Sequence, residues 1–141
     1  MSTLKVTNVA HETSTLNTLV FDNGGGSGNG RVTTKGTIGE ISAVSYASTI
    51  TLDFRTANNF STTLTGNVTF ANPSNISAGQ SGVLFITQDG TGGRTAAFGS
   101  YWDFSDGTAP TLSTGANQVD VIAWIARTTT NITAQFIGNF S

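Results

Sequence analysis

Hydrophobic and polar residues alternate along much of this chain with the period of two that is typical of β-strands. The clearest case is the segment 49–54 (TITLDF), in which Ile50, Leu52 and Phe54 fall on one face. Because alternate side chains of a strand point to opposite faces, we expect these three residues to lie in a core. Further core positions are expected in the segments that follow, at Phe60, Leu64 and Phe70.

The segment 83–86 (VLFI) is apolar on both faces, which is typical of a central strand covered on each side. A glycine-rich stretch, 89–93 (DGTGG), separates it from a second candidate strand at 94–98 (RTAAF). Glycine permits the positive φ angles of tight hairpin turns. These two strands are therefore predicted to form a hairpin.

A second hairpin is predicted at the C-terminal end of the chain. The segment 119–126 alternates, so that one face carries Val119, Val121, Ala123 and Ile125 and the other carries Asp120, Ile122, Trp124 and Ala126. After the polar run 128–131 (TTTN), Ile132, Ala134 and Phe136 resume the pattern. We expect an antiparallel pair that ends the domain.

The remaining candidate strands are 18–22, 31–34, 38–46, 60–64 and 68–70. A total of about eight to ten short strands, separated by Gly, Asn and Asp turns, predicts an all-β fold. The architecture we expect is an antiparallel β-sandwich, with a jelly-roll as one topology and an extended N-terminal arm. The order of the strands does not follow from the pattern.

The run 23–30 (NGGGSGNG) has the composition of a flexible linker. We therefore divide the chain into an N-terminal arm with this Gly-rich loop, residues 1–35, and a β-sandwich domain, residues 36–141. A length of 141 residues is sufficient for one domain with a core of useful size and an additional arm.

Charge and cysteine content narrow the classes of partner. The net charge is -2 and the six basic residues are scattered, so a nucleic-acid partner is not expected. The chain has no cysteine and therefore neither a disulfide nor a thiolate zinc site. The first residues lack the apolar stretch of a signal peptide and no segment approaches transmembrane length, which predicts folding in the cytoplasm and no membrane partner.

Residues able to carry chemistry are few, and no enzyme is predicted. The single histidine, His11, has only Glu12 beside it, which does not suffice for a catalytic triad or a metal cluster. Asp103 and Asp106 form the close carboxylate pair that a glycosidase would need, next to Tyr101, Trp102 and Phe104. Packing is favoured for this cluster over sugar stacking or catalysis. No catalytic residue and no cofactor are assigned.

A calcium site is the metal alternative that the sequence leaves open. Calcium takes six to eight oxygen ligands and tolerates loops. Oxygen-bearing side chains lie close in sequence, but the EF-hand spacing is absent, so turn capping is favoured over a metal site. The four residues concerned are Asp103, Asp106, Asn117 and Asp120.

Three motifs between residues 81 and 121 carry a resemblance to a known class of protein. They are QDGTGGR at 88–94, GTAPTLST at 107–114 and NQVDV at 117–121. Together they resemble a β-domain found near the C-termini of bacteriophage tail-fibre and other virion surface proteins. The resemblance covers roughly the last two thirds of the chain and implies a virion component.

The short arm decides our first expectation about function. A fibre that reaches for a receptor normally adds a long repetitive shaft, whereas an independent β-domain with a glycine-rich arm suits a capsid decoration (cement) protein that stabilises the head shell. The alternative is a tail fibre or tail appendage module that binds a host receptor or another tail protein. The expected partners are other copies of the chain, as a homotrimer, and the major capsid protein or other virion proteins.

Partner contacts are expected in two places. In the arm they are Leu4, Val6, Leu16, Leu19 and Phe21, since extended arms can add strands to a neighbour's sheet. In the domain they are Tyr101, Trp102 and Phe104. A chain that begins at Val32 is therefore expected to fold but to assemble poorly.

Overall fold

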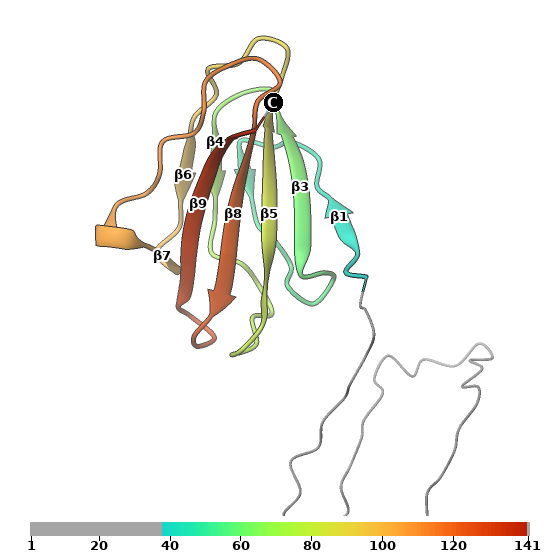
Figure 1. The fold of residues 1–141 in the computed structure, drawn as a ribbon. Coiled ribbons are helices and arrows are strands. Elements are labelled where there is room, and N and C mark those ends of the chain that lie inside the picture. Colours follow the sequence, from blue (N-terminus) through green and yellow to red (C-terminus); the bar gives the residue numbers. More distant parts are fainter. Residues whose placement is uncertain (1–37, 141) are drawn as a thin grey trace, which may run out of the picture. The chain divides into compact units, whose positions relative to one another are not determined.

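Nine short strands and one 3-10 turn make up the part of the chain that the computed structural model describes, residues 38–140 (Figure 1). The strands are β1 (Ile41–Ala43), β2 (Thr49–Ile50), β3 (Asn59–Leu64), β4 (Val68–Phe70), β5 (Ser81–Gln88), β6 (Ala96–Phe98), β7 (Trp102–Phe104), β8 (Val119–Ala126) and β9 (Ile132–Phe140). The turn, η1 (Ser105–Gly107), follows β7. The predicted all-β class is confirmed.

The strands form two sheets between which the chain passes repeatedly. The larger sheet has the order β1-β3-β5-β8-β9-β7, and the smaller has the order β2-β4-β6 (Figure 1). From β1 to β6 the chain alternates between them, so that each pair of consecutive strands makes one coil. Ile41 pairs with Asn59 and Asn59 with Val83, all in parallel. Three coils are thus stacked one on the next.

The pairing differs from the antiparallel sandwich that we expected. Only β5–β8 and β8–β9 are antiparallel, while the other five pairs of strands in residues 38–140 are parallel. The reason is that each coil returns the chain to the same sheet in the same direction. The topology is therefore not a jelly-roll, in which Greek-key connections join antiparallel strands.

The predicted hairpin at 83–98 is wrong, whereas the C-terminal hairpin is confirmed. β5 and β6 lie in different sheets, and β6 pairs in parallel with β4. The loop between them is held by Asp89, which accepts hydrogen bonds from the amides of Thr91 and Gly92. This loop carries the chain from one sheet to the other. At the C-terminal end, β8 and β9 pair antiparallel, with Trp124 opposite Ala134.

One hydrophobic core lies between the two sheets. Ile50, Leu52 and Phe54 are buried together, as the alternation of 49–54 predicts. Phe54 stacks on Phe60, with ring centroids 5.8 Å apart. The other expected core residues, Leu64 and Phe70, are fully buried in the same cluster.

β8 contributes a buried charge to the inner side of the sheet. Asp120 is 1% exposed, and its two oxygens accept hydrogen bonds from the amides of Ser113 and Asn139, at 2.8 and 3.0 Å. A buried carboxylate is tolerated when such donors replace its water shell. Asp120 thereby ties the 108–118 segment and the end of β9 to the centre of the sheet.

Candidate interaction surface

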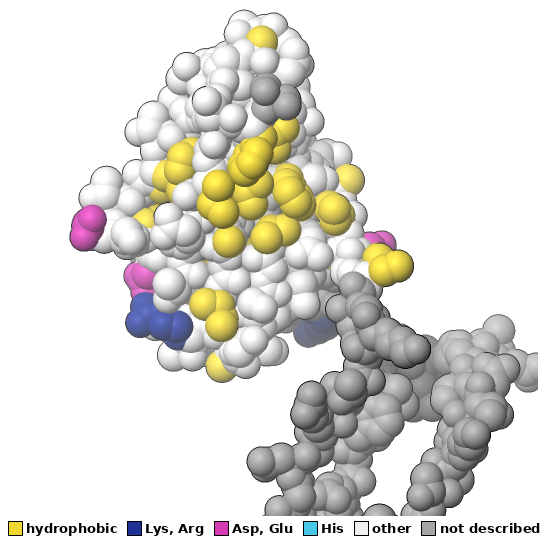
Figure 2. Space-filling view, in the orientation of Figure 1, with side chains coloured by type: hydrophobic (Ala, Val, Ile, Leu, Met, Phe, Trp, Pro, Cys, Tyr) yellow, Lys and Arg dark blue, Asp and Glu magenta, His cyan; other side chains and the backbone are white. Residues whose placement is uncertain are grey.

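Apolar side chains gather on the outer side of the larger sheet, the side that faces away from the core. Inward positions of β5 and β8 are fully buried at Leu84 and Ile122. The alternate positions point outward, and the register places Phe85 beside Val121 and Val121 beside Ile137. Figure 2 shows this side, with hydrophobic side chains clustered over β5, β8 and β9.

We call this surface the apolar face. It consists of Val83, Phe85, Val119, Val121, Ala123, Ile125, Ile137 and Phe140. Three of the large side chains are about half exposed: Ile125 at 48%, Ile137 at 47% and Phe140 at 50%. A hollow in the face is lined by Phe85, Val119, Val121 and Phe140. Contiguous exposed apolar surface of this kind marks interaction sites in soluble proteins.

The apolar face is also uncharged. β5 and β9 contain no charged residue, and the single charge of β8, Asp120, is buried on the opposite side. A small register shift at Val119–Val121 brings Phe140 next to Val119 at the end of the face. A partner that binds the apolar face would therefore make apolar contacts and would not need to neutralise a charge on it.

Hydroxyl groups line the same side of the sheet next to the apolar face. A groove there is bordered by the 43–46 segment, by 61–63 of β3 and by Thr87 of β5. Thr63 pairs with Thr87, and Thr87 pairs with Val119 of the apolar face. Tyr46, which is half-buried, donates its hydroxyl to the carbonyl of Asn67 at 3.0 Å. We call this the hydroxyl groove.

The aromatic segment expected to contact a partner is divided between core and surface. Trp102 is 6% exposed, and its Nε1 donates to the carbonyl of Ala71. Tyr101 and Phe104 are half-buried and pack against the core. A small groove runs between Phe104 and Phe136, with Ser105, Thr108, Pro110, Ala134 and Gln135 completing its lining. Only Tyr101 and Phe104 of this segment thus offer surface to a partner.

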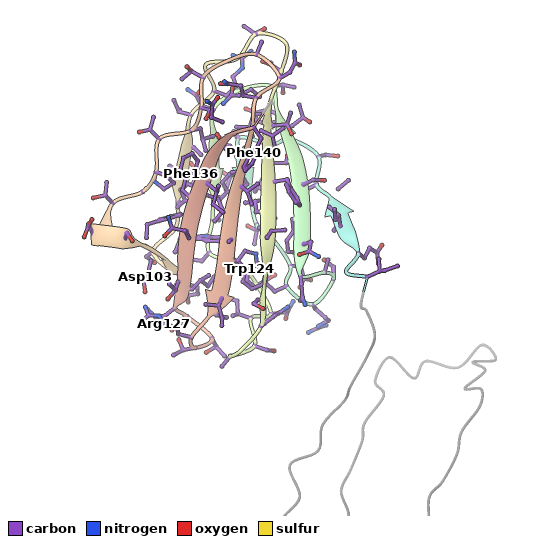
Figure 3. All side chains as sticks on the ribbon, in the orientation of Figure 1. Asp103, Trp124, Arg127, Phe136 and Phe140 are labelled. Atoms are coloured by element: carbon purple, nitrogen blue, oxygen red, sulfur yellow. The ribbon has the colours of Figure 1, made fainter. Side chains whose placement is uncertain are left out.

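The residues considered as calcium ligands have separate partners. Asp103 forms an ion pair with Arg127 and accepts a hydrogen bond from Asn131 (Figure 3). Asp120 is occupied by two backbone amides, as described above. Asp106 and Asn117 lie in turns and have positive φ angles of 58° and 60°. Within residues 38–140, no three His, Cys, Asp or Glu side chains lie close enough together to hold a metal ion.

A family model described as "Putative phage tail fibre C-terminal domain" matches residues 33–131, which is more than half of the chain. The chain belongs to this family. The match confirms the resemblance to phage virion β-domains that the motifs in 81–121 carry. Comparisons with curated proteins and with solved structures gave no match.

Several expected contacts of this tail fibre domain lie outside the described residues. They are the arm positions Leu4, Val6, Leu16, Leu19 and Phe21. His11, which was considered for catalysis and metal binding, also lies outside the described residues. Among the described residues there is no helix of the length and apolar character that a membrane span requires.

Sequence reasoning missed the apolar face of the tail fibre domain, although its signal is present. The segment 83–86 is apolar on both sides, and so is most of 119–126. The pattern of 83–86 predicts a strand covered on both sides, and the alternation of 119–126 predicts two faces without indicating which is exposed. In the structure their inner side chains are buried, whereas Ile125 and Ile137 on the outer side are half exposed.

Proposed function

We propose that this chain is a non-enzymatic module of a phage tail fibre, which acts in the virion by binding other proteins or a host receptor. The observation that carries the proposal is the family match over residues 33–131. The described structure adds an uncharged apolar face, which suits protein contact rather than catalysis. Tail fibre domains are structural elements, and a structural role agrees with both features.

This proposal reverses the order of the two readings of the sequence. We first expected a capsid decoration protein because the arm is short. The description of the matched family names the phage tail fibre and not the capsid. The match therefore supports the tail fibre alternative better than the decoration role. The decoration role remains the competing hypothesis in the experiment below.

We place the receptor contact in the groove between Phe104 and Phe136. Two aromatic rings line it together with the polar side chains of Ser105, Thr108 and Gln135. A concave site with apolar walls and a few polar groups is the usual form of a small-ligand site, and a sugar offers both C–H surfaces and hydroxyls. A host surface polysaccharide is thus the ligand class that we propose for this groove.

Competition for adsorption tests the receptor contact. Purified protein in excess should slow the adsorption of the phage to its host, and the Phe104→Ala variant should compete at least about tenfold less well. A matched control is Thr69→Ala, since Thr69 is exposed on β4 of the smaller sheet. Equal competition by the wild type and Phe104→Ala would remove the groove from the proposal.

The location on the particle tests the tail assignment itself. Electron microscopy of purified virions with a labelled antibody against the chain should place the label on the tail. Label spread over the head would instead establish the decoration role. The two results are distinguishable on one particle, so either outcome decides between the hypotheses.

A further inference from the structure

We propose that the apolar face packs against the apolar face of a second copy of this chain, sheet against sheet. The inference concerns what covers one side of the larger sheet. It does not depend on whether the protein lies on the tail or on the head of the particle.

The first argument is that β5 is apolar on both sides, as in a strand covered by two layers, but only its inner side is covered. On the inner side, Leu84 and Ile86 are 0% and 1% exposed. On the outer side, Val83 and Phe85 are half-buried and pair with Ala123 and Val121 of β8, in the same face as half-exposed Ile125 and Ile137. Strands that are apolar on both faces normally lie between two layers. Within residues 38–140, the second layer on this side is missing.

The second argument identifies the missing layer as another copy, because five of the six strands carry no outward charge. The outer sides of β1, β3, β5, β8 and β9 present no Asp, Glu, Lys or Arg, and at the edge strand β7 the outward Asp103 is paired with Arg127. Copies of one chain carry the same net charge of -2 and repel each other elsewhere. This side of the sheet is where two copies can meet without opposing like charges. A nucleic acid or another polyanion would find no counter-charge here.

The third argument is the area available. Five strands spaced about 4.8 Å apart give a width of about 24 Å, and the length of β8 is about 27 Å at about 3.4 Å per residue. Because β1 has three residues and β3 has six, the side measures about 550 Å², or about 1,100 Å² for two copies, which is close to the lower limit of specific interfaces. The whole side is needed to approach this limit, so the hydroxyl groove would form part of the contact.

The distribution of side chains agrees with such a contact. Interfaces generally have an apolar centre and a polar rim. Here the apolar face of β5, β8 and β9 adjoins the hydroxyl-bearing side chains of Ser61, Thr63 and Thr87. Two sheets packed in this way lie about 10 Å apart. In a symmetric pair, each copy would contribute the same residues to both halves of the interface.

The decisive measurement is the mass of the full chain in solution, by sedimentation or light scattering, for the wild type and two charge variants. We expect the wild type to be oligomeric and Ile137→Glu to be monomeric, with a dissociation constant at least about 100-fold higher, because a carboxylate cannot be buried there without a partner. Thr69→Glu is the matched control, since it places the same charge on an exposed strand position of the smaller sheet. It should remain oligomeric.

A thiol probe gives a second readout that does not depend on the folding of Ile137→Glu. The chain has no cysteine, so Gln135→Cys introduces a single thiol on the outer side of β9, next to Ala123. Its reaction with a maleimide should slow as the protein concentration rises, whereas the reaction rate of Thr69→Cys should not depend on the protein concentration. The proposal is overturned if the wild type is monomeric at all concentrations, if Ile137→Glu stays oligomeric, or if Gln135→Cys reacts independently of concentration.

Discussion

The ring of Phe54 stacks on the indole of Trp124, with ring centroids 4.1 Å apart and ring planes inclined by 17°. Phe54 lies in the connection between β2 and β3, and Trp124 lies in β8. The stack therefore joins the coiled part of the fold to the C-terminal antiparallel pair. Contacts between such distant segments carry the cooperativity of a small domain.

Replacing Trp124 by alanine should destabilise the fold by about 3–5 kcal/mol, because the indole is 4% exposed and the change leaves a cavity beneath Phe54. Trp124→Phe is the control that keeps an aromatic ring. Trp124→Phe also removes the indole N–H, which has no hydrogen-bond partner in the described part of the chain. This variant should therefore lose clearly less stability than Trp124→Ala. Chemical unfolding measures both, and an unchanged curve for Trp124→Ala would contradict the stacked core.

Gly82→Ala should prevent the close approach of β5 to the connection before β3. A Cβ on Gly82 would lie 1.8 Å from the carbonyl oxygen of Asn58, a backbone atom that cannot turn away. We expect a loss of several kcal/mol or an insoluble protein. Gly90→Ala is the matched control, since nothing lies within 4 Å of its added Cβ. Similar melting temperatures for the two variants would refute this explanation.

Asp120→Ala should cost about 1–3 kcal/mol, because the change removes the buried carboxylate that accepts hydrogen bonds from the amides of Ser113 and Asn139. Asp120→Asn retains one acceptor oxygen and should cost less. Urea unfolding of the three proteins at neutral pH tests the order. If alanine is tolerated as well as asparagine, the carboxylate does not hold these two segments.

Acid should weaken the loop after β5. The hydrogen bond from the Arg94 side chain, together with the amides of Gly92 and Thr91, lowers the pKa of Asp89 below its ordinary 3.8, although partial burial acts in the opposite direction. A carboxylate with a lowered folded pKa stabilises the fold above about pH 4, and this contribution is lost as the pH falls through the folded pKa. Asp89→Asn should therefore be less stable at pH 7, and its difference from the wild type should shrink on acidification.

The effect at Asp89 should be modest, because the Arg94 and Asp89 side chains are 27% and 20% exposed. Asp106→Asn is a suitable control, since Asp106 is exposed in η1 and asparagine accepts its positive φ of 58°. Thermal unfolding between pH 7 and pH 2 provides the comparison. A constant difference between wild type and Asp89→Asn over this range would argue against the pH linkage.

A chain shortened to begin at Val32 should still fold and melt cooperatively, because the core lies within residues 38–140 and the family match begins at residue 33. We expect it to bind the virion less well than the full chain does. Binding to particles that lack the protein measures this directly. Equal binding of the two forms would exclude a role for the first 31 residues in attachment.

The positions of the core residues could be predicted from local patterns. Ile50, Leu52 and Phe54 alternate with polar residues, and the strand period alone places them on one side. The C-terminal hairpin was predictable for a similar reason, since a short polar turn joins two alternating segments that pair antiparallel. Family membership also showed in local motifs between residues 81 and 121.

The partners of the strands were not predictable in the same way. The glycine-rich loop at 89–93 resembles a hairpin turn, yet it carries the chain across the core to β4 of the other sheet. Parallel pairing joins residues about 20 positions apart, such as Thr49 and Thr69, and no local pattern encodes that distance. β7 was missed altogether, because its three residues read as an aromatic cluster and not as a strand.

The amino-acid sequence by itself determined the all-β class, the inward positions of the core and the membership of the tail fibre family, because these depend on side-chain period and on short motifs. Only the tertiary structure decided that the coils stack in parallel, that Trp102 faces inward, and that the outer positions of β5, β8 and β9 remain half exposed. Burial depends on which distant segments come to lie over a side chain. A strand with two apolar faces therefore shows that both sides can be covered, and the fold determines which side a partner must cover.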